Sequence, residues 1–512
     1  MMKRLLLVAV GLSITASVIA NNTTGHTFFS IQRPYWQSGS PERVTFFRQD
    51  IMDTCPEGWG GGFQAAVFGG KSTNANCLGR FFYPVDKTAL RVKEYKAGDP
   101  ALSPDNDPTK DVEARNFNIA TVNGASDDAD LAPFESVIQF NPDHTFFGIG
   151  FAWKQQFWRC DEGYSRFWYE IAFPVVRISN NMNLSETIIS DGGGSDGVAG
   201  LNDAVHVASM RAAFAQPEML YGRIPLCGPC TKWGVGDVEI KFGWNSLCGE
   251  TCHYNSYVGI VAPTGNRPEA RVLFEPIVGN NHHWGIMYGS NMGYEFWTCR
   301  DHSIEIEFDL NGRYLFTNHQ RRLLSLHDKS WGTFLEMYRN VEEASAAAAA
   351  DSQFSGTFGA NILAQCVKVS PRFSFDLNSA LIYRHCGWEV EAGYNFYARH
   401  KENVCLESWT ETPQVKNIDG QGDTNTARTI KNNFTGSSIL LADYQPIFKQ
   451  DLDLGAAAHP AVLANIIYVA VGYQPSCFNH PMTFGLGGGY EFSSGNDELS
   501  RWTLWGKYVL AY

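Results

Sequence analysis

The chain has 512 residues, of which 44% are hydrophobic, 13% aromatic and only 18% charged. Soluble domains carry about 25% charged residues, so this composition departs from theirs, and the high aromatic content argues against intrinsic disorder. Glycine (49 residues), phenylalanine (34), tyrosine (21) and tryptophan (14) suit strands, tight turns and membrane interfaces. The formal net charge of -13 argues against a nucleic-acid partner, because the phosphate backbone is bound by clustered lysine and arginine.

Residues 1–20 have the composition of a secretory signal peptide. The basic residues Lys3 and Arg4 precede an apolar run from Leu5 to Ala20, which ends in small residues suited to cleavage. An N-terminal membrane anchor is the alternative, which the short apolar run disfavours. We therefore expect this segment to be removed and the chain to be exported.

After the signal peptide, no segment of about 20 residues is typical of a transmembrane helix. The nearest, Leu454 to Tyr473, is uncharged, but it contains His459 and Pro460 and its second half alternates like a strand. An exported chain of this kind is either a soluble protein or an outer-membrane β-barrel. The periodicity and length of its strands distinguish the two.

The segment from Ser303 to Phe316 alternates between apolar and polar side chains. The apolar set includes Ile304, Ile306, Phe308 and Leu310, and the charged set includes Glu305, Glu307, Asp309 and Arg313. Because successive side chains of a strand point to opposite faces, this pattern predicts a strand with one apolar and one charged surface. It is longer than the usual soluble strand of about five or six residues and reaches the length of about nine to eleven that crosses a bilayer.

The same alternation recurs along the chain. It is clearest in Phe167–Val175, Val238–Trp244, Trp284–Phe296, Phe373–Tyr383 and Trp388–Ala398. Weaker examples are Phe134–Phe140, Phe146–Phe157, Tyr257–Ala262, Ile466–Tyr473, Met482–Phe492 and Trp502–Tyr512. Together these segments predict an all-β fold, an antiparallel transmembrane β-barrel of about 12–14 strands, where Gly60–Ala65 would raise the count above twelve. A soluble β-sandwich is the alternative.

Connection lengths support a barrel with two different ends. The connections near 246–251, 298–301, 385–387 and 474–481 are short, whereas those across 180–232, 318–364 and 401–461 are long. Outer-membrane barrels have short turns at one end and long loops at the other, and the short connection at Asn141–Thr145 is the exception to this pattern. The chain before residue 134 is less periodic. We therefore assign 21–133 to an N-terminal plug or periplasmic segment and 134–512 to the transmembrane barrel.

Four cysteines form two close pairs, Cys227 with Cys230 and Cys248 with Cys252. A thioredoxin-like redox site would need a helix after the first pair, where a strand is predicted instead. A zinc site that also used His253 would need the pairs to meet, yet about thirteen extended residues between them span roughly 40 Å. We predict local disulfides, which an oxidising periplasm permits, and the sequence leaves their connectivity open.

Charged side chains on the inward faces are the strongest functional signal. The lumen-facing candidates are Asp237, Glu239, Lys241, Glu295, Glu305, Glu307, Asp309, Arg313, Arg384, Glu389, Glu391 and Arg399. A barrel of this size has a polar lumen in which such residues set ion selectivity. A ladder of salt bridges that only stiffens the wall is the alternative. Because carboxylates predominate near Glu305 and Glu389, we expect a weak preference for cations if the pore conducts.

Two short motifs resemble those of a known family. Gly236-Asp237-Val238 opens one predicted strand, and Ala262-Pro263-Thr264-Gly265-Asn266 closes the next. In these motifs the chain resembles the outer-membrane transport barrels for hydrophobic compounds, namely the fatty-acid/toluene transporters and the phenol-degradation-pathway barrels. The Asn-Pro-Ala motif of the fatty-acid group is absent near the mature N-terminus. The stretch 28–47 also resembles uncharacterised outer-membrane proteins of host-dependent bacteria.

These observations favour a channel of the cell outer membrane for passive uptake of small solutes, with hydrophobic compounds implied by the resemblance. The alternative is a structural or surface-exposed barrel with a sealed lumen, whose loops bind host or envelope partners. The motifs indicate no enzyme, cofactor or metal centre. The partners that we expect are outer-membrane lipid and small solutes, without nucleic acid.

Overall fold

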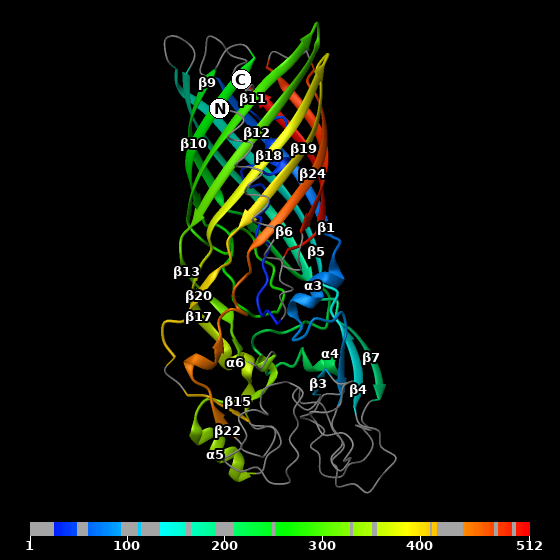
Figure 1. Ribbon diagram of the computed structural model, residues 1–512, viewed down its shortest axis with the longest axis vertical. Helices are drawn as coiled ribbons and strands as arrows, with labels where there is room; N and C mark the ends of the chain where they lie inside the picture. Colours follow the sequence, from blue (N-terminus) through cyan, green and yellow to red (C-terminus); the bar gives the residue numbers. More distant parts are fainter. Residues whose placement is uncertain are drawn as a thin grey trace.

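The computed structural model describes residues 25–48, 60–93, 111–113, 134–159, 165–190, 209–247, 251–327, 331–350, 356–409, 412–416, 444–475, 480–493 and 498–512. In this part of the chain, twelve antiparallel strands close into a barrel, which extends at one end into a region of short strands and helices (Figure 1). The predicted all-β barrel is thus confirmed. The signal peptide expected over residues 1–20 lies outside the described residues.

The barrel strands, in their order around the ring, alternate in direction. They are β1 (Gly61–Ser72), β5 (Asp143–Arg159), β6 (Ser165–Asn181), β9 (Val238–Leu247), β10 (Cys252–Ala262), β11 (Gly285–Cys299), β12 (His302–Leu315), β18 (Arg372–His385), β19 (Trp388–Arg399), β24 (Val462–Tyr473), β25 (Met482–Ser493) and β26 (Arg501–Ala511). The ring closes where β26 pairs with β1, from Gly62 opposite Ala511 to Ser72 opposite Arg501. A further strand, β8 (Cys230–Val235), extends β9 along β6.

One of the predicted barrel strands is wrong. The segment Phe134–Phe140 forms β4 (Glu135–Gln139), which pairs outside the barrel with β2 (Leu90–Lys93) and β7 (Ser185–Ser190). With five residues, β4 is too short to cross a bilayer. Its place in the ring is taken by β1, so the barrel begins well before residue 134. The apparent exception at Asn141–Thr145 disappears, because that connection joins β4 to β5 and does not link two barrel strands.

The outward face of the barrel is apolar. Exposed aliphatic side chains along the strands include Val67, Ile149, Val258, Leu381, Val469, Leu486 and Leu504. Exposed aromatic side chains lie toward one rim at Trp158, Trp244, Trp297, Trp388, Tyr473 and Phe484, and toward the other at Phe147, Trp284, Phe316, Phe373, Tyr490 and Trp502. An apolar band between two aromatic girdles is the surface that a barrel presents to lipid, whereas soluble proteins rarely expose so large an apolar patch. We therefore treat the barrel as membrane-spanning.

Burial alternates along the middle of β12. Phe308 is exposed and Ile306 half-buried on the outward face, whereas Glu305, Glu307 and Asp309 are buried on the inward face. The lumen therefore contains the charged side of this strand.

The two ends of the barrel differ. The short connections, such as Arg300–Asp301 between β11 and β12, lie at the end where the C-terminus is found (Figure 1). The long connections fold together at the opposite end into a cap with its own apolar core, which includes Phe81, Phe82, Phe140 and Trp331. None of the helices in the described part of the chain is both long and apolar enough to cross a membrane.

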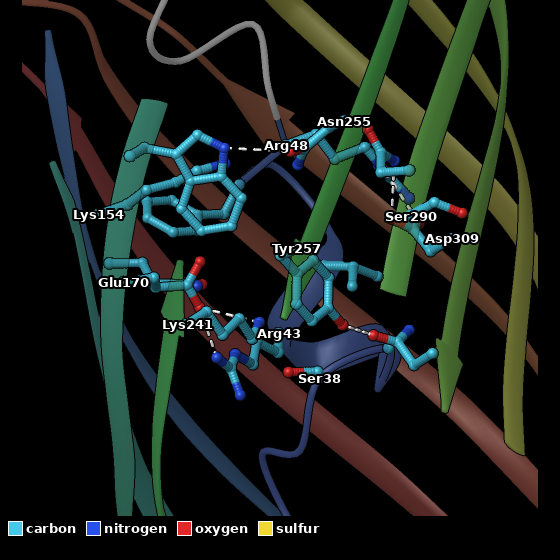
Figure 2. Close-up of a pocket in the computed structure, with 17 residues that line it drawn as sticks. Ser38, Arg43, Arg48, Lys154, Glu170, Lys241, Asn255, Tyr257, Ser290 and Asp309 are labelled. Atoms are coloured by element: carbon cyan, nitrogen blue, oxygen red, sulfur yellow. Dashed lines mark hydrogen bonds and ion pairs between the residues drawn. The ribbon is translucent and has the colours of Figure 1, made fainter. Parts of the chain in front are cut away.

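The remaining elements belong mainly to the cap. Its helices are α3 (Ala75–Phe82), α4 (Met210–Ala213), α5 (Val341–Ala350), α6 (Gly359–Leu363) and the 3-10 turns η3 (Gly332–Phe334) and η6 (Lys449–Asp451). Its other strands are β3 (Val112–Glu113), β13 (Asn318–Leu323), β14 (Ser325–Leu326), β15 (Glu336–Tyr338), β16 (Thr357–Phe358), β17 (Ala364–Ser370), β20 (Asn403–Cys405), β21 (Gln414–Lys416), β22 (Tyr444–Pro446) and β23 (Leu452–Asp453). The short helix α2 (Pro41–Val44) lies instead inside the barrel, as Figure 2 shows.

Candidate functional site

The barrel lumen is occupied by the N-terminal segment 25–48, which we call the plug. Its first residues are anchored in the cap, where the backbone N–H of His26 donates to Phe81 O and that of Thr27 to Ala456 O, both at 3.0 Å. Further along, the indole N–H of Trp36 donates to Phe151 O of the barrel wall at 3.1 Å. The plug therefore connects the cap to the inner surface of the barrel.

Small residues of the wall make room for the aromatic side chains of the plug. A Cβ added at Gly150 would lie 2.2 Å from the ring of Trp36, and one added at Gly485 would lie 2.2 Å from the ring of Phe46. Within the plug, Gly39 has a φ of +85°, which residues with a Cβ rarely adopt. In β25, Gly485 thus allows close packing against the plug.

The charge of the plug is complementary to that of the wall. Arg43 lies 2.5 Å from Glu170 and also pairs with Glu239. Lys241 lies 3.1 Å from Glu170, and Arg313 also pairs with Glu239. Figure 2 shows Arg43 next to Glu170 and Lys241 on one side of the lumen. All of these side chains are buried, so three cations and two carboxylates form one network of ion pairs inside the lumen.

Arg48 makes the second set of ion pairs. It forms a bidentate pair with Glu391, at 2.7 and 2.8 Å, and lies 3.6 Å from Asp309 and 3.9 Å from Glu307. Glu391 also accepts a hydrogen bond from the hydroxyl of Tyr468 at 2.7 Å. Bidentate arginine–carboxylate pairs are among the strongest charged hydrogen bonds. This pair fixes the end of the plug that lies farthest from the cap.

Arg33 makes a third set of ion pairs near the cap, and its shortest distance is longer than the shortest in each of the other two sets. It lies 3.7 Å from Asp376 and 3.9 Å from Glu491. Gln37 donates to Asp376 at 3.1 Å, so this carboxylate also receives a neutral contact from the plug. The three plug arginines together place positive charge along the acidic wall.

The predicted lumen-facing residues divide into three groups. Those that contact the plug are Glu239, Glu307, Asp309, Glu391 and Arg399. Three others are buried and have partners outside the plug. Asp237 accepts a hydrogen bond from Asn280. Lys241 pairs with Glu170, and Arg313 pairs with Glu239. Those near the short-turn rim are Glu305, Arg384 and Glu389, which form one chain of ion pairs, and Glu295, which accepts from Thr298. The structure therefore does not gather the carboxylates into one acidic ring.

The plug arginines were missed by the sequence analysis. Arg33, Arg43 and Arg48 lie in a segment without period-two alternation, so no face could be assigned to them. Their partners lie more than 100 residues further along the chain. One signal in the sequence could have indicated their role. The three arginines are closely spaced in a short segment that precedes a barrel with acidic inward faces.

The space that remains in the lumen is small. A cavity of about 60 Å³ lies beside α2, lined by residues that include Arg43, Lys154, Tyr257 and Asp309 (Figure 2). This volume is well below the roughly 300–1,000 Å³ of sites that bind small molecules. A larger vestibule of about 350 Å³, lined in part by Arg384, opens at the short-turn end. With the plug in place, the cavity beside α2 is thus too small for a typical small-molecule ligand.

The cysteine pairs lie far apart. Cys230 begins β8 and Cys252 begins β10, at opposite ends of the wall, because β8 and β9 run in sequence along β6. The zinc site weighed for the two pairs is therefore excluded by geometry. Cys227 and Cys230 are not joined, so the disulfide predicted between them is not formed in the structure. Cys248 lies outside the described residues, and its pairing with Cys252 stays a prediction.

Buried histidines lie where the plug enters the cap. The ring of His26 stacks on Phe81 with 4.4 Å between the ring centroids, and that of His459 lies 5.3 Å from Phe29. Burial lowers the pKa of His26 and of His283 to about 4 and that of His459 to about 3. These imidazoles are therefore neutral at pH 7 and are protonated only if the junction opens or the pH falls far.

We expect the cap to lose stability as the pH falls from 6.5 to about 4. In this window the unfolded histidines bind protons and the folded ones do not, so acidification favours opening, by up to about 1.4 kcal/mol per histidine and pH unit. Burial raises the pKa of Glu498 to about 8 and also raises that of Glu275, and these carboxyls act in the opposite sense. Hydrogen exchange of cap amides at pH 7 and 5, corrected for intrinsic rates, measures the effect. His26→Phe should reduce the pH dependence, and an unchanged dependence in that variant would contradict the assignment.

The chain resembles known proteins only in overall fold. No protein-family model and no curated protein matches the sequence. Among solved structures, the chain is similar to an outer membrane channel from Pseudomonas putida F1, at 9% identity over 89% of this chain and 96% of that one, with a TM-score of 0.38. It is also similar to a FadL homologue from Pseudomonas aeruginosa (9% identity, 96% and 97% covered, TM-score 0.29) and to the toluene transporter TodX from Pseudomonas putida (7%, 96% and 97%, 0.28). The functional proposal below therefore depends on the lumen itself.

Proposed function

We propose that the protein is a channel of the outer membrane for small solutes, which the plug holds closed. The observation that carries this proposal is the chemistry of the contact between plug and wall. The plug is held by ion pairs such as Arg43–Glu170 and Arg48–Glu391, and the wall behind it carries charged and amide side chains. Water can solvate such a surface when the plug moves, whereas it would not fill an apolar core. The lumen can therefore become an aqueous path.

The composition of the lumen favours polar solutes over hydrophobic ones. The wall around the cavity carries Lys154, Glu170, Lys241, Asn255 and Asn291, all of which are buried. Fixed charges and amides of this kind interact with ions and hydrogen-bonding groups. We propose the orientation typical of outer-membrane barrels, with the short turns in the periplasm and the cap outside.

The test is conductance in a planar bilayer. The wild-type protein should be closed most of the time, and a variant in which residues 34–48 are replaced by a glycine-serine linker of equal length should show steady open steps. Without Arg43 and Arg48, Glu391 loses its arginine partner and Glu239 keeps only that of the wall, Arg313, so the open pore should prefer cations in a salt gradient. The heat-dependent mobility of the barrel on gels controls for folding. A folded variant without open steps would contradict the proposal.

A sealed structural barrel is the second candidate. The observation in its favour is the cap, in which long connections share a core of buried aromatic side chains such as Phe140, Phe214 and Trp331. A surface of this kind, held rigidly at the end of the barrel, suits the binding of host or envelope partners. The same bilayer measurement distinguishes the two functions, since a sealed barrel stays closed without its plug.

A further inference from the structure

We infer that the barrel wall carries a binding site for one divalent transition-metal ion, such as Zn²⁺, formed by His253, Glu305 and Glu307. His253 belongs to β10 and both glutamates to β12, so the site bridges across β11 near the short-turn rim. One nitrogen of the imidazole and one oxygen of each carboxylate lie within 4.8 Å of one another. The three side chains are 12%, 9% and 1% exposed, so they lie inside the wall and not on its surface.

The hydrogen bonds around the site assign a role to each ligand atom. Asn291 donates through Nδ2 to Glu307 Oε2 and to Asp309 Oδ1, both at 2.7 Å, so its Oδ1 is the acceptor. His253 Nε2 lies 2.9 Å from this oxygen and therefore carries the proton. Its Nδ1 then carries the lone pair, 3.8 Å from Glu305 Oε1. A metal-binding histidine commonly donates its other N–H to an oxygen in this way.

The carboxylates are oriented in the same manner. Glu305 uses Oε2 for its pair with Arg384, and Glu307 uses Oε2 for Asn291. Oε1 of Glu305 lies 3.8 Å from His253 Nδ1, and Oε1 of Glu307 lies 3.2 Å from His253 Nε2, so both carboxylates border the imidazole. Ligand atoms bound at about 2.1 Å around a tetrahedral ion lie about 3.4 Å apart, which is close to the 3.8 Å between His253 Nδ1 and Glu305 Oε1.

A glycine provides the space for the ion. Gly293 of β11 lies between the ligands, and a Cβ added there would come within 2.2 Å of His253, 2.4 Å of Glu305 Oε1 and 2.8 Å of Glu307 Oε1. The position thus has no room for a larger residue, and the three ligands converge above its backbone. The vestibule at the short-turn end is lined by Arg384, which pairs with Glu305 of the site.

The donor set indicates the class of ion. One nitrogen and two carboxylate oxygens suit Zn²⁺ and related divalent metals, with a water molecule as the fourth ligand. Ca²⁺ requires six to eight oxygen ligands at about 2.3–2.6 Å, which three protein groups do not supply. The proposal therefore predicts preference for Zn²⁺ over Ca²⁺, which a cluster of carboxylates alone would not produce.

Calorimetric titration of the untagged, full-length protein with Zn²⁺ tests the site. We expect one binding event in the wild type that weakens at least tenfold in His253→Ala and in Glu307→Gln, and Ca²⁺ should not compete. Gly293→Ala keeps all three ligands and should also abolish the event, because its methyl group occupies the place of the ion. Glu295→Gln is the matched control, since it removes a carboxylate from the same rim outside the site.

The cysteines of the chain are a possible competing source of binding, and Co²⁺ distinguishes them. Nitrogen and oxygen ligation gives only weak visible bands, whereas thiolate ligation adds an intense charge-transfer band in the near ultraviolet. If Gly293→Ala loses the weak visible bands of Co²⁺ and keeps any charge-transfer band, the result supports the site. The proposal is overturned if the wild type binds no Zn²⁺, if the isotherm of folded His253→Ala matches that of the wild type, or if Glu295→Gln loses as much affinity as Glu307→Gln.

Discussion

Replacing Arg48 with glutamine is expected to release the plug and to raise the open probability of the channel at least tenfold. The side chain of Glu391 is fully buried and receives two hydrogen bonds from Arg48, at 2.7 and 2.8 Å. Removing one partner of a buried ion pair costs about 3–5 kcal/mol, because the remaining charge has no compensation. Displacement of the plug lets water reach Glu391, so this cost falls on the closed state. A tenfold change corresponds to only about 1.4 kcal/mol and is a conservative expectation.

Two further variants make this prediction specific. Lys71→Gln removes a cation from an ion pair with Asp143 at 3.1 Å, but Lys71 is 50% exposed and such pairs contribute about 0–1 kcal/mol. Its open probability should therefore remain that of the wild type. The double variant Arg48→Gln/Glu391→Gln removes both buried charges, so its open probability should return most of the way to that of the wild type. Single-channel recording measures all three, and an Arg48→Gln protein that stays closed while folded would show that the plug is held by other contacts.

The barrel could be predicted from the sequence because its strands are long and one face of each meets lipid. The alternation in β12 predicts Glu305, Glu307 and Asp309 on the inward face, and the structure buries all three side chains. Period two is a local property, so it can be recognised within a single strand without knowledge of the partners. The same reasoning identified the other long strands of the ring.

The assignment of β1 was weaker for a physical reason. Its sequence, GGFQAAVFGGKS, contains four glycines and two alanines, and small residues carry little hydrophobic contrast between the two faces. The structure explains this composition in part, since Gly70 closely approaches the backbone of Trp502 and the ring of Phe146. By contrast, β4 has a clear alternation in its burial, but its apolar face packs in the cap. Alternation identifies a strand with two different faces, and it does not say what covers the apolar one.

The plug could not be placed from the sequence, because its conformation depends on distant partners. The backbone oxygen of Gln32 accepts hydrogen bonds from Tyr397 and Arg399, and that of Gly39 accepts one from Asn395. These contacts join positions separated by more than 350 residues. Because the partners belong to strands distant in the sequence, no local pattern encodes these contacts. The acidic face of the wall was therefore visible in the sequence, and its neutralisation by the plug was not.

The second large effect concerns the outward face of β12. Replacing Ile306 with arginine should lower the free energy of unfolding by about 2–4 kcal/mol if the position lies near the bilayer midplane, because a guanidinium would face hydrocarbon. Glu307→Gln changes the next residue on the inward face, and in metal-free buffer it should cost less than about 1 kcal/mol, since the amide oxygen can still accept from Asn291. Urea unfolding in lipid vesicles, followed by tryptophan fluorescence, measures both variants. Similar losses in the two would contradict the assignment of one face to lipid and the other to the lumen.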